Sequence, residues 1–176
     1  IEGLPESAID LGRQTAMEKN LEGYVFTLQA PSYIPFLTYS AKRNLRQKMY
    51  MAYNTMCTHD NENNNIAIVG KIVNLHRELA QMLGYETYAD YALSQRMAEN
   101  TPNVHKLLND LIDAYMPTAL AEVKEVEDLY YEDNDIDPST LSESDPRRFM
   151  PWDFSFYSNK LKERKFNINS EMLRPY

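Results

Sequence analysis

Cysteine is nearly absent from this sequence, since Cys57 is the only one among 176 residues. A single thiol cannot close an intramolecular disulfide, which favours a reducing, cytoplasmic compartment. The sequence also lacks the roughly 18 consecutive apolar residues of a membrane span, so we expect no membrane partner. No signal peptide opens the chain. Because the first residue is Ile1 rather than Met, the natural N-terminus can be absent, and a periplasmic or exported location stays open.

Positive charge is in the minority, because 18 Lys and Arg residues face 26 Asp and Glu residues and the net charge is −8 at pH 7. Nucleic-acid-binding proteins carry a basic patch or stripe, so we expect no nucleic-acid partner. Five glycines and nine prolines leave room for long helices. The hydrophobic share of 43% is enough for a core. The thirteen tyrosines suit core edges and the walls of a wet cleft.

Apolar residues recur at helical spacing through most of the chain, which predicts an all-α fold, an antiparallel bundle of helices joined by short loops. We expect a first helix over 8–19. The aromatic and β-branched residues at 24–28 predict a short strand or an extended segment. Pro31 and Pro35 predict an extended turn, which one long helix over 36–57 then follows.

Capping residues divide the rest of the chain into further helices. Gly84 should end a helix in a left-handed conformation, and Thr87 should cap a short helix after it. Thr101 and Pro102 predict another start, whereas Pro117 predicts a kink or a new helix that runs to about residue 131. The helix before Gly84 has a broad apolar stripe, made of Ile68, Val69, Ile72, Val73, His76, Leu79, Ala80 and Leu83.

The domain organisation that we predict is a single helical domain over 1–176. Its parts are an N-terminal helix with an extended segment at 1–35, a main helical core at 36–131, an acidic connector at 132–150 and a truncated C-terminal helix at 151–176. Pro151-Trp152-Asp153 should open that last helix, and Ser170 would cap one more.

The sequence contains no self-contained catalytic motif. The three histidines are His59, His76 and His105, and no two of them have the i, i+4 spacing of a His-Glu-x-x-His zinc site. His59 lies in a polar loop without a second nitrogen or sulfur ligand. His76 lies on an apolar helical face. There it is either a ligand or general base, or a core-edge histidine with one satisfied nitrogen, which we favour.

Other reactive or charged residues also have structural interpretations. We expect Cys57 to be a small buried residue near a helix end. The acidic residues Asp133, Asp135 and Asp137 imitate a calcium loop without its glycine and terminal glutamate, which predicts a solvated loop. Four basic residues should form either a solvated face or a seam against an acidic neighbour: Lys42, Arg43, Arg46 and Lys48.

Four motifs follow one another in an order that resembles one peptidase family. They are Thr-Leu-x-x-Pro-Ser-Tyr-x-Pro-Phe at 27–36, Leu-Ala-x-x-Leu-Gly-Tyr at 79–85, Pro-Trp-Asp at 151–153 and Leu-Arg-Pro-Tyr at 173–176. Together they resemble the central region of the thimet oligopeptidase, neurolysin, oligopeptidase A and peptidyl-dipeptidase Dcp family. The resemblance covers essentially the whole chain and is closest to bacterial Dcp.

The resemblance implies a parent that is an all-helical, two-lobed zinc peptidase of the gluzincin type, which cuts short peptides in a deep channel. In that family the His-Glu-x-x-His motif follows the Leu-Arg-Pro-Tyr stretch, so no catalytic or metal residue is assigned here, and the substrate-binding residues are unknown. We expect zinc in the full-length parent and none bound by these 176 residues, which should be inactive alone. Their partners would be the missing lobes of the same polypeptide, and their role would be channel wall and scaffold.

Two other functions remain open at this point. One is a freestanding helical protein–protein interaction domain without enzymatic activity. The other is a metalloenzyme that uses His59 or His76. A segment of a larger peptidase should expose more apolar area than the few hundred Å² that are normal for a monomer, because its natural covering is missing.

Overall fold

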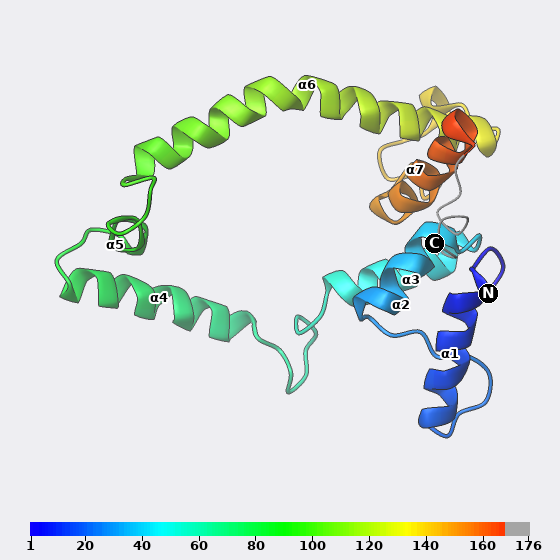
Figure 1. The fold of residues 1–176 in the computed structure, drawn as a ribbon, viewed down its shortest axis with the longest axis horizontal. Helices are drawn as coiled ribbons and strands as arrows, with labels where there is room; N and C mark the ends of the chain where they lie inside the picture. Colours follow the sequence, from blue (N-terminus) through cyan, green and yellow to red (C-terminus); the bar gives the residue numbers. More distant parts are fainter. Residues whose placement is uncertain (168–176) are drawn as a thin grey trace. The chain divides into compact units, whose positions relative to one another are not determined.

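The computed structural model describes residues 1–167, which form helices and no β-strand (Figure 1). The predicted all-α class is therefore confirmed. The segment at 24–28 is extended and runs beside α1, where Val25 N donates to Gly12 O over 2.9 Å. The helices are α1 (Glu6–Glu18), α2 (Ala30–Tyr39), α3 (Arg43–Asn54), α4 (Ile66–Met82), α5 (Tyr88–Leu93), α6 (Thr101–Asp133) and α7 (Pro151–Phe166), with a 3₁₀ turn η1 at Pro138–Thr140.

Two compact units make up the chain. The first combines Ile1–Asn54 with Glu122–Tyr176, and the second is Thr55–Ala121. The long helix α6 belongs to both, because its first part lies in the second unit and its last turns lie in the first. Residues 36–131 are divided between the two units, and the domain ranges given from the sequence stay a prediction.

The first unit has the main core. Here α1 packs on α2, while α2 and α3 both pack on α7. The last turns of α6 add a buried apolar cluster, and the connector after α6 contributes Leu141, which is 8% exposed. After α6 ends at Asp133, the rest of the predicted connector at 132–150 contains no helix except η1, and Leu141 anchors it in the core. The cluster consists of Val126, Leu129, Tyr130, Tyr131, Leu141 and Tyr157.

The prediction of an extended turn and one long helix over 36–57 was wrong. The chain is already helical at Ala30, and Pro31 lies in the first turn. Backbone N–H groups have no helical partner there, so proline costs little. The helix then stops, because Ser40 is extended with ψ at 120°. The break leaves the carbonyls of Ser40 and Ala41 free, and the buried Arg46 side chain binds both of them.

The second unit contains α4, α5 and the first part of α6. Gly84 has φ at +83° after α4, and the Thr87 side chain accepts from Asp90 N at the start of α5, as predicted. The prediction of a new helix at Pro117 was wrong, because α6 runs through it without a break. Pro117 and Asp113 are exposed, so water can satisfy the Asp113 carbonyl that proline leaves without a donor. None of the helices in residues 1–167 combines the length and apolar character needed to cross a membrane.

Candidate functional site

The most developed polar site of the first unit is centred on Asp153, the third residue of α7. Its side chain is completely buried and accepts from Arg43 Nε at 3.0 Å and Nη2 at 2.8 Å. Arg46 Nη2 donates to the other carboxylate oxygen at 2.9 Å. The Met150 backbone N–H adds a bond of 3.1 Å that caps the helix. One carboxylate thus holds two guanidinium groups of α3 against the start of α7.

The remaining donors of both arginines bind backbone carbonyls. Arg43 donates to Pro146 O at 2.6 Å and to Arg148 O at 2.7 Å. Arg46 donates to Trp152 O at 3.1 Å, in addition to the carbonyls at the break before α3. These bonds link segments that lie more than 100 residues apart in the sequence. Because its donors and acceptors are used internally, this network is suited to fixing the fold rather than to binding a substrate.

Electrostatics favour the charged form of Arg43. Burial by itself lowers the pKa of Arg43, but the hydrogen bond and the negative charge of Asp153 outweigh it, so the pKa is raised. Aromatic rings cover the two cations, with the Arg46 guanidinium 4.3 Å from the centre of the Phe156 ring and that of Arg43 5.4 Å from the Tyr130 ring. Such cation–π contacts are strongest where water is excluded, as it is around Arg46.

The alternative of a seam against an acidic neighbour is confirmed for Arg43 and Arg46. Sequence reasoning did not find Asp153 as that neighbour, nor that Arg46 is only 2% exposed. One signal was present, because Arg43, Arg46 and Tyr50 have the i, i+3, i+7 spacing of a single helical face. Lys42, in contrast, pairs with Glu2 at the surface.

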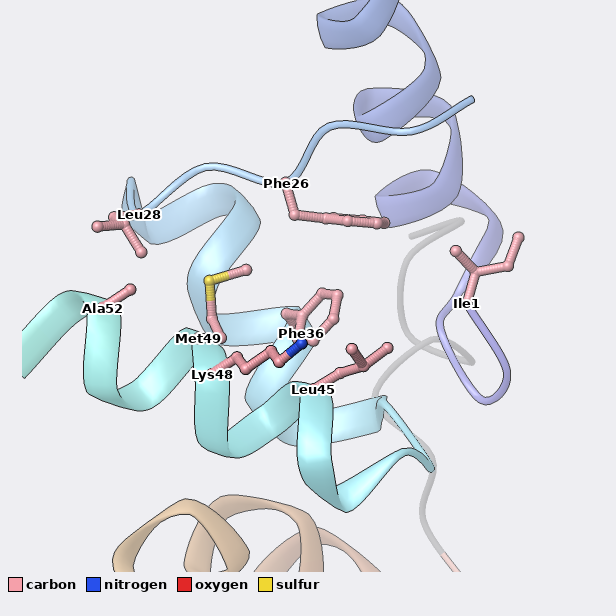
Figure 2. Close-up of a pocket in the computed structure, with 8 residues that line it drawn as sticks. All are labelled: Ile1, Phe26, Leu28, Phe36, Leu45, Lys48, Met49 and Ala52. Atoms are coloured by element: carbon pink, nitrogen blue, oxygen red, sulfur yellow. The ribbon is translucent and has the colours of Figure 1, made fainter. Parts of the chain in front are cut away.

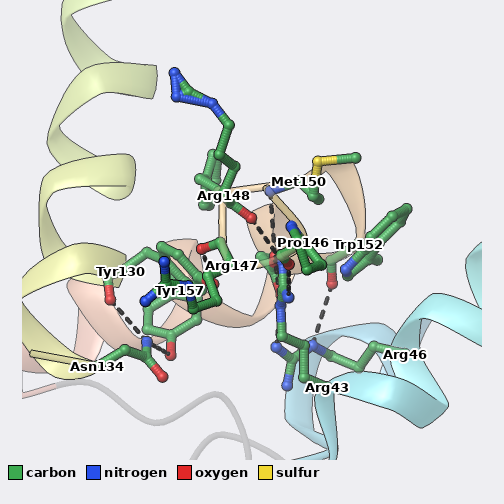
Figure 3. A network of polar contacts seen from close by, with 12 residues as sticks. Arg43, Arg46, Tyr130, Asn134, Pro146, Arg147, Arg148, Met150, Trp152 and Tyr157 are labelled. Carbon is green, nitrogen blue, oxygen red and sulfur yellow. Dashed lines mark hydrogen bonds and ion pairs between the residues drawn. The ribbon is translucent and has the colours of Figure 1, made fainter. Parts of the chain in front are cut away.

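Three buried tyrosines surround this network and use their hydroxyls internally. Tyr130 donates to Arg147 O at 2.8 Å, and the Tyr131 hydroxyl accepts from Phe149 N at 3.2 Å. The Tyr157 hydroxyl accepts from Asn134 Nδ2 at 2.8 Å, as Figure 3 shows. The predicted role in a channel wall therefore fails for these three tyrosines, because their hydroxyls face the core.

An apolar pocket of about 500 Å³ lies between α3 and the segment that leads into α2 (Figure 2). This volume is within the range of small-molecule sites. Lys48 is the charged residue of its lining and the other lining side chains are apolar, so the pocket is suited to an apolar group. The lining residues are Ile1, Phe26, Leu28, Phe36, Leu45, Lys48, Met49 and Ala52.

The histidines do not assemble a metal site. His59 lies in the exposed loop before α4, as predicted, with Nε2 3.1 Å from Thr55 Oγ1. His76 is exposed and stacks on Tyr88 at 4.1 Å, so the expected core-edge position was wrong. His105 is exposed on α6. Within residues 1–167, no three His, Cys, Asp or Glu side chains lie close enough to hold a metal ion. The described residues thus do not fit the ligand set of a zinc peptidase.

Cys57 and the acidic residues after it also bear on the sequence interpretation. Cys57 is exposed with φ at +58°, so the prediction that it is buried was wrong. Its position follows from the early end of α3 at Asn54, which leaves Cys57 in a turn. Asp133, Asp135 and Asp137 are exposed, as predicted for a solvated loop, although Asp133 still belongs to α6. Asp133 also forms an ion pair with Lys160, and Asp137 caps η1. Ser170 and the Leu-Arg-Pro-Tyr stretch lie outside the described residues.

Comparisons with known proteins place these features in a family context. The family described as "Peptidase family M3" matches residues 36–176. Oligopeptidase A of Haemophilus influenzae is 38% identical to this chain over 178 residues, which cover 99% of the chain and 25% of that protein. Oligopeptidase A of Escherichia coli is 36% identical, with the same two coverages. The chain spans about a quarter of the length of these curated relatives.

Similarity to a second branch is lower. Dipeptidyl carboxypeptidase of Escherichia coli is 25% identical over 175 residues, which cover 99% of the chain and 24% of that protein. The sequence motifs were interpreted as closest to a bacterial peptidyl-dipeptidase. The higher identity to oligopeptidase A favours that branch instead.

Proposed function

Because this chain belongs to peptidase family M3, we propose that it forms part of a zinc metallopeptidase that cleaves short peptides. Within that enzyme it supplies scaffold, and the residues that bind zinc and act on the peptide belong to other parts of the polypeptide. The relatives named oligopeptidase A support an oligopeptidase mode of cleavage. A peptidyl-dipeptidase mode is the alternative within the same family.

The observation that carries the scaffold role is the buried network of Arg43, Arg46 and Asp153. It joins α3, the connector and α7, and its polar groups bond to one another or to backbone. The sequence supports this role independently, because it contains no His-Glu-x-x-His motif. A contribution to a channel wall would fall to tyrosines that remain at least partly exposed, such as the stacked pair Tyr33 and Tyr53.

The second candidate is a freestanding helical interaction domain without enzymatic activity. The exposed apolar residues of α4 and α6 favour it, because such residues would also serve to bind another protein. The two functions differ in what the rest of the full-length polypeptide must contain. A peptidase needs catalytic residues there, whereas an interaction domain does not.

Peptide cleavage tests the proposal. The purified 176-residue chain and the full-length polypeptide would each be incubated with a quenched fluorescent peptide, with a chelator and then with added zinc. We expect cleavage by the full-length protein, loss of it with the chelator and recovery with zinc, whereas the chain alone should be inactive. Stoichiometric, chelator-sensitive cleavage by the chain alone would show that the assignment of the catalytic residues elsewhere is wrong.

A pair of variants in the full-length protein tests the scaffold role. Asp153→Asn removes the buried charge, and Asp128→Asn removes a charge from the exposed ion pair with Lys124 as the control. We expect Asp153→Asn to lower thermal stability and activity together. A variant that loses activity while its melting temperature stays at the wild-type value would contradict a purely structural role.

A further inference from the structure

One face of α4 is apolar along its whole length and is open to solvent. Five residues at i, i+4, i+7, i+11 and i+14 form it, and we call them the α4 face. This spacing keeps side chains on one side of a helix. Leu75 at its centre is 62% exposed, and Met82 near its end is 86% exposed. The α4 face consists of Ile68, Ile72, Leu75, Leu79 and Met82.

The second unit does not cover this face. The helix α5 packs against α4, but its contacts are with the neighbouring side of the helix. There His76 stacks on Tyr88, and Ala80 is completely buried while its carbonyl accepts from Tyr85 N. Ala80 is the buried residue of α4. An amphipathic helix in a globular protein normally turns its apolar stripe toward a core, and here that core is missing.

The α4 face itself contains no charged residue. Lys71 and Glu78 border one edge of it, three or four positions from Ile68, Leu75 and Met82, whereas Arg77 lies on the opposite side of the helix. A partner that binds this face must therefore offer an apolar surface and not a charged one. The chain spans about a quarter of the length of its curated relatives, so a polypeptide of several times its own length is expected to contain it.

From these observations we propose that the α4 face binds an apolar helix surface in the remainder of the same peptidase polypeptide. The inference rests on the proposed function, because it requires that this chain is a segment of a longer M3 peptidase. The new element is the contact itself: the α4 face is the surface through which the second unit binds the rest of the enzyme. A second copy of the chain is the competing occupant.

Cysteine labelling tests the inference without an activity assay. Leu75→Cys places a thiol at the centre of the α4 face, and Gln81→Cys places one on the exposed polar side of the same helix as the matched control. Both variants would be made in the full-length polypeptide and in the 176-residue chain. A maleimide would be added, and mass spectrometry would follow the labelling of the α4 peptides, so that Cys57 and other cysteines do not interfere.

In the full-length protein we expect the thiol at position 75 to react at least about tenfold more slowly than in the isolated chain, because thiol reactivity requires access. The thiol at position 81 should react at similar rates in both. Equal rates at position 75 in both proteins would overturn the inference. Protection that appears only as the protein concentration is raised would also overturn it, because it would identify a second copy as the occupant.

Peptidase activity is measured separately on the same unlabelled full-length protein. Protection at position 75 in a protein that cleaves no peptide would reject the proposed function and keep the α4 interface. Normal cleavage without protection would reject the interface and keep the function. Leu75→Glu, with Gln81→Glu as its control, adds a stability readout, since only the first should lower the melting temperature of the full-length protein.

Discussion

Replacing Asp153 with asparagine removes the negative charge that Arg43 and Arg46 share. The side chain keeps its size, so the packing around the start of α7 is little changed. Its new amide group, however, faces guanidinium donors. The Arg43 side chain is 32% exposed and can regain water, but the Arg46 side chain is 2% exposed and cannot. The variant therefore leaves a buried cation without its counter-charge.

Removing one partner of a buried ion pair typically costs about 3–5 kcal/mol. Arg43 is partly exposed, so its lost charged hydrogen bonds are each worth about 1.5–3 kcal/mol at most. We expect Asp153→Asn to lower the free energy of unfolding of the first unit by about 3–5 kcal/mol, dominated by Arg46. Asp128→Asn at the exposed pair with Lys124 should change the free energy of unfolding far less, because solvent screens an exposed ion pair.

Urea unfolding measured by tryptophan fluorescence suits this test. Trp152 is the only tryptophan of the chain, lies next to Asp153 and is 9% exposed. Its emission should therefore report on the first unit. From the most to the least stable protein, the order should be wild type, Asp128→Asn, Arg43→Met and then Asp153→Asn. The double variant Arg46→Met with Asp153→Asn should be destabilised by less than the sum of its single changes, because the residues are in direct contact.

Two results would refute this reasoning. The first is an Asp153→Asn midpoint that matches that of Asp128→Asn at an unchanged denaturant slope. The second is strict additivity in the double variant, which would mean that Arg46 and Asp153 do not stabilise each other.

Three further predictions concern the core, the turn after α4 and an acidic cap. Leu129 is 4% exposed in the buried cluster of the first unit, so Leu129→Ala should cost about 2–5 kcal/mol in urea unfolding, and an unchanged midpoint would contradict this. Gly84→Ala should lower the thermal midpoint at a cost of about 1–2 kcal/mol, because φ is +83°. Gly70→Ala, with open space around the added carbon, should raise the free energy of unfolding by about 0.5–1 kcal/mol. Equal melting temperatures for Gly84→Ala and Gly70→Ala would contradict the left-handed conformation at Gly84. Hydrogen bonds from the hydroxyls of Thr87 and then Thr101 lower the pKa of Asp90, so its stabilisation is present above pH about 4 and is lost as the pH falls through the lowered value. Asp90→Asn should flatten this acid-dependent loss of helical circular dichroism, and an unaltered pH profile would show that Asp90 does not contribute.

The break between α2 and α3 shows where prediction from the sequence ended. Residues 36–57 have the apolar spacing of one helix, and nothing local stops that helix at Tyr39. The chain becomes extended at Ser40, and the side chain of Arg46 in the next helix binds the carbonyls of Ser40 and Ala41 that this break leaves free. A periodicity argument does not consider such bonds between a side chain and the backbone.

Arg46 shows a second limit of the sequence. Its basic run predicts either a solvated face or a seam against an acidic neighbour, and Arg46 is buried because it pairs with Asp153, 107 residues further along the chain. The sequence motif Pro-Trp-Asp correctly predicted the start of α7, since proline and a capping carboxylate act within one turn. It did not show which residues would meet that carboxylate.

The sequence by itself determined the all-α class, the turn at Gly84, the cap at Thr87 and the start of α7, because each depends on residues within a few positions. It also indicated the peptidase family, through motifs in a fixed order. Only the tertiary structure decided which charged residues are buried, where the long helix is divided and which apolar stripes stay uncovered. Burial depends on the segments that the chain brings together across more than 100 residues, and neither local propensity nor periodicity contains that information.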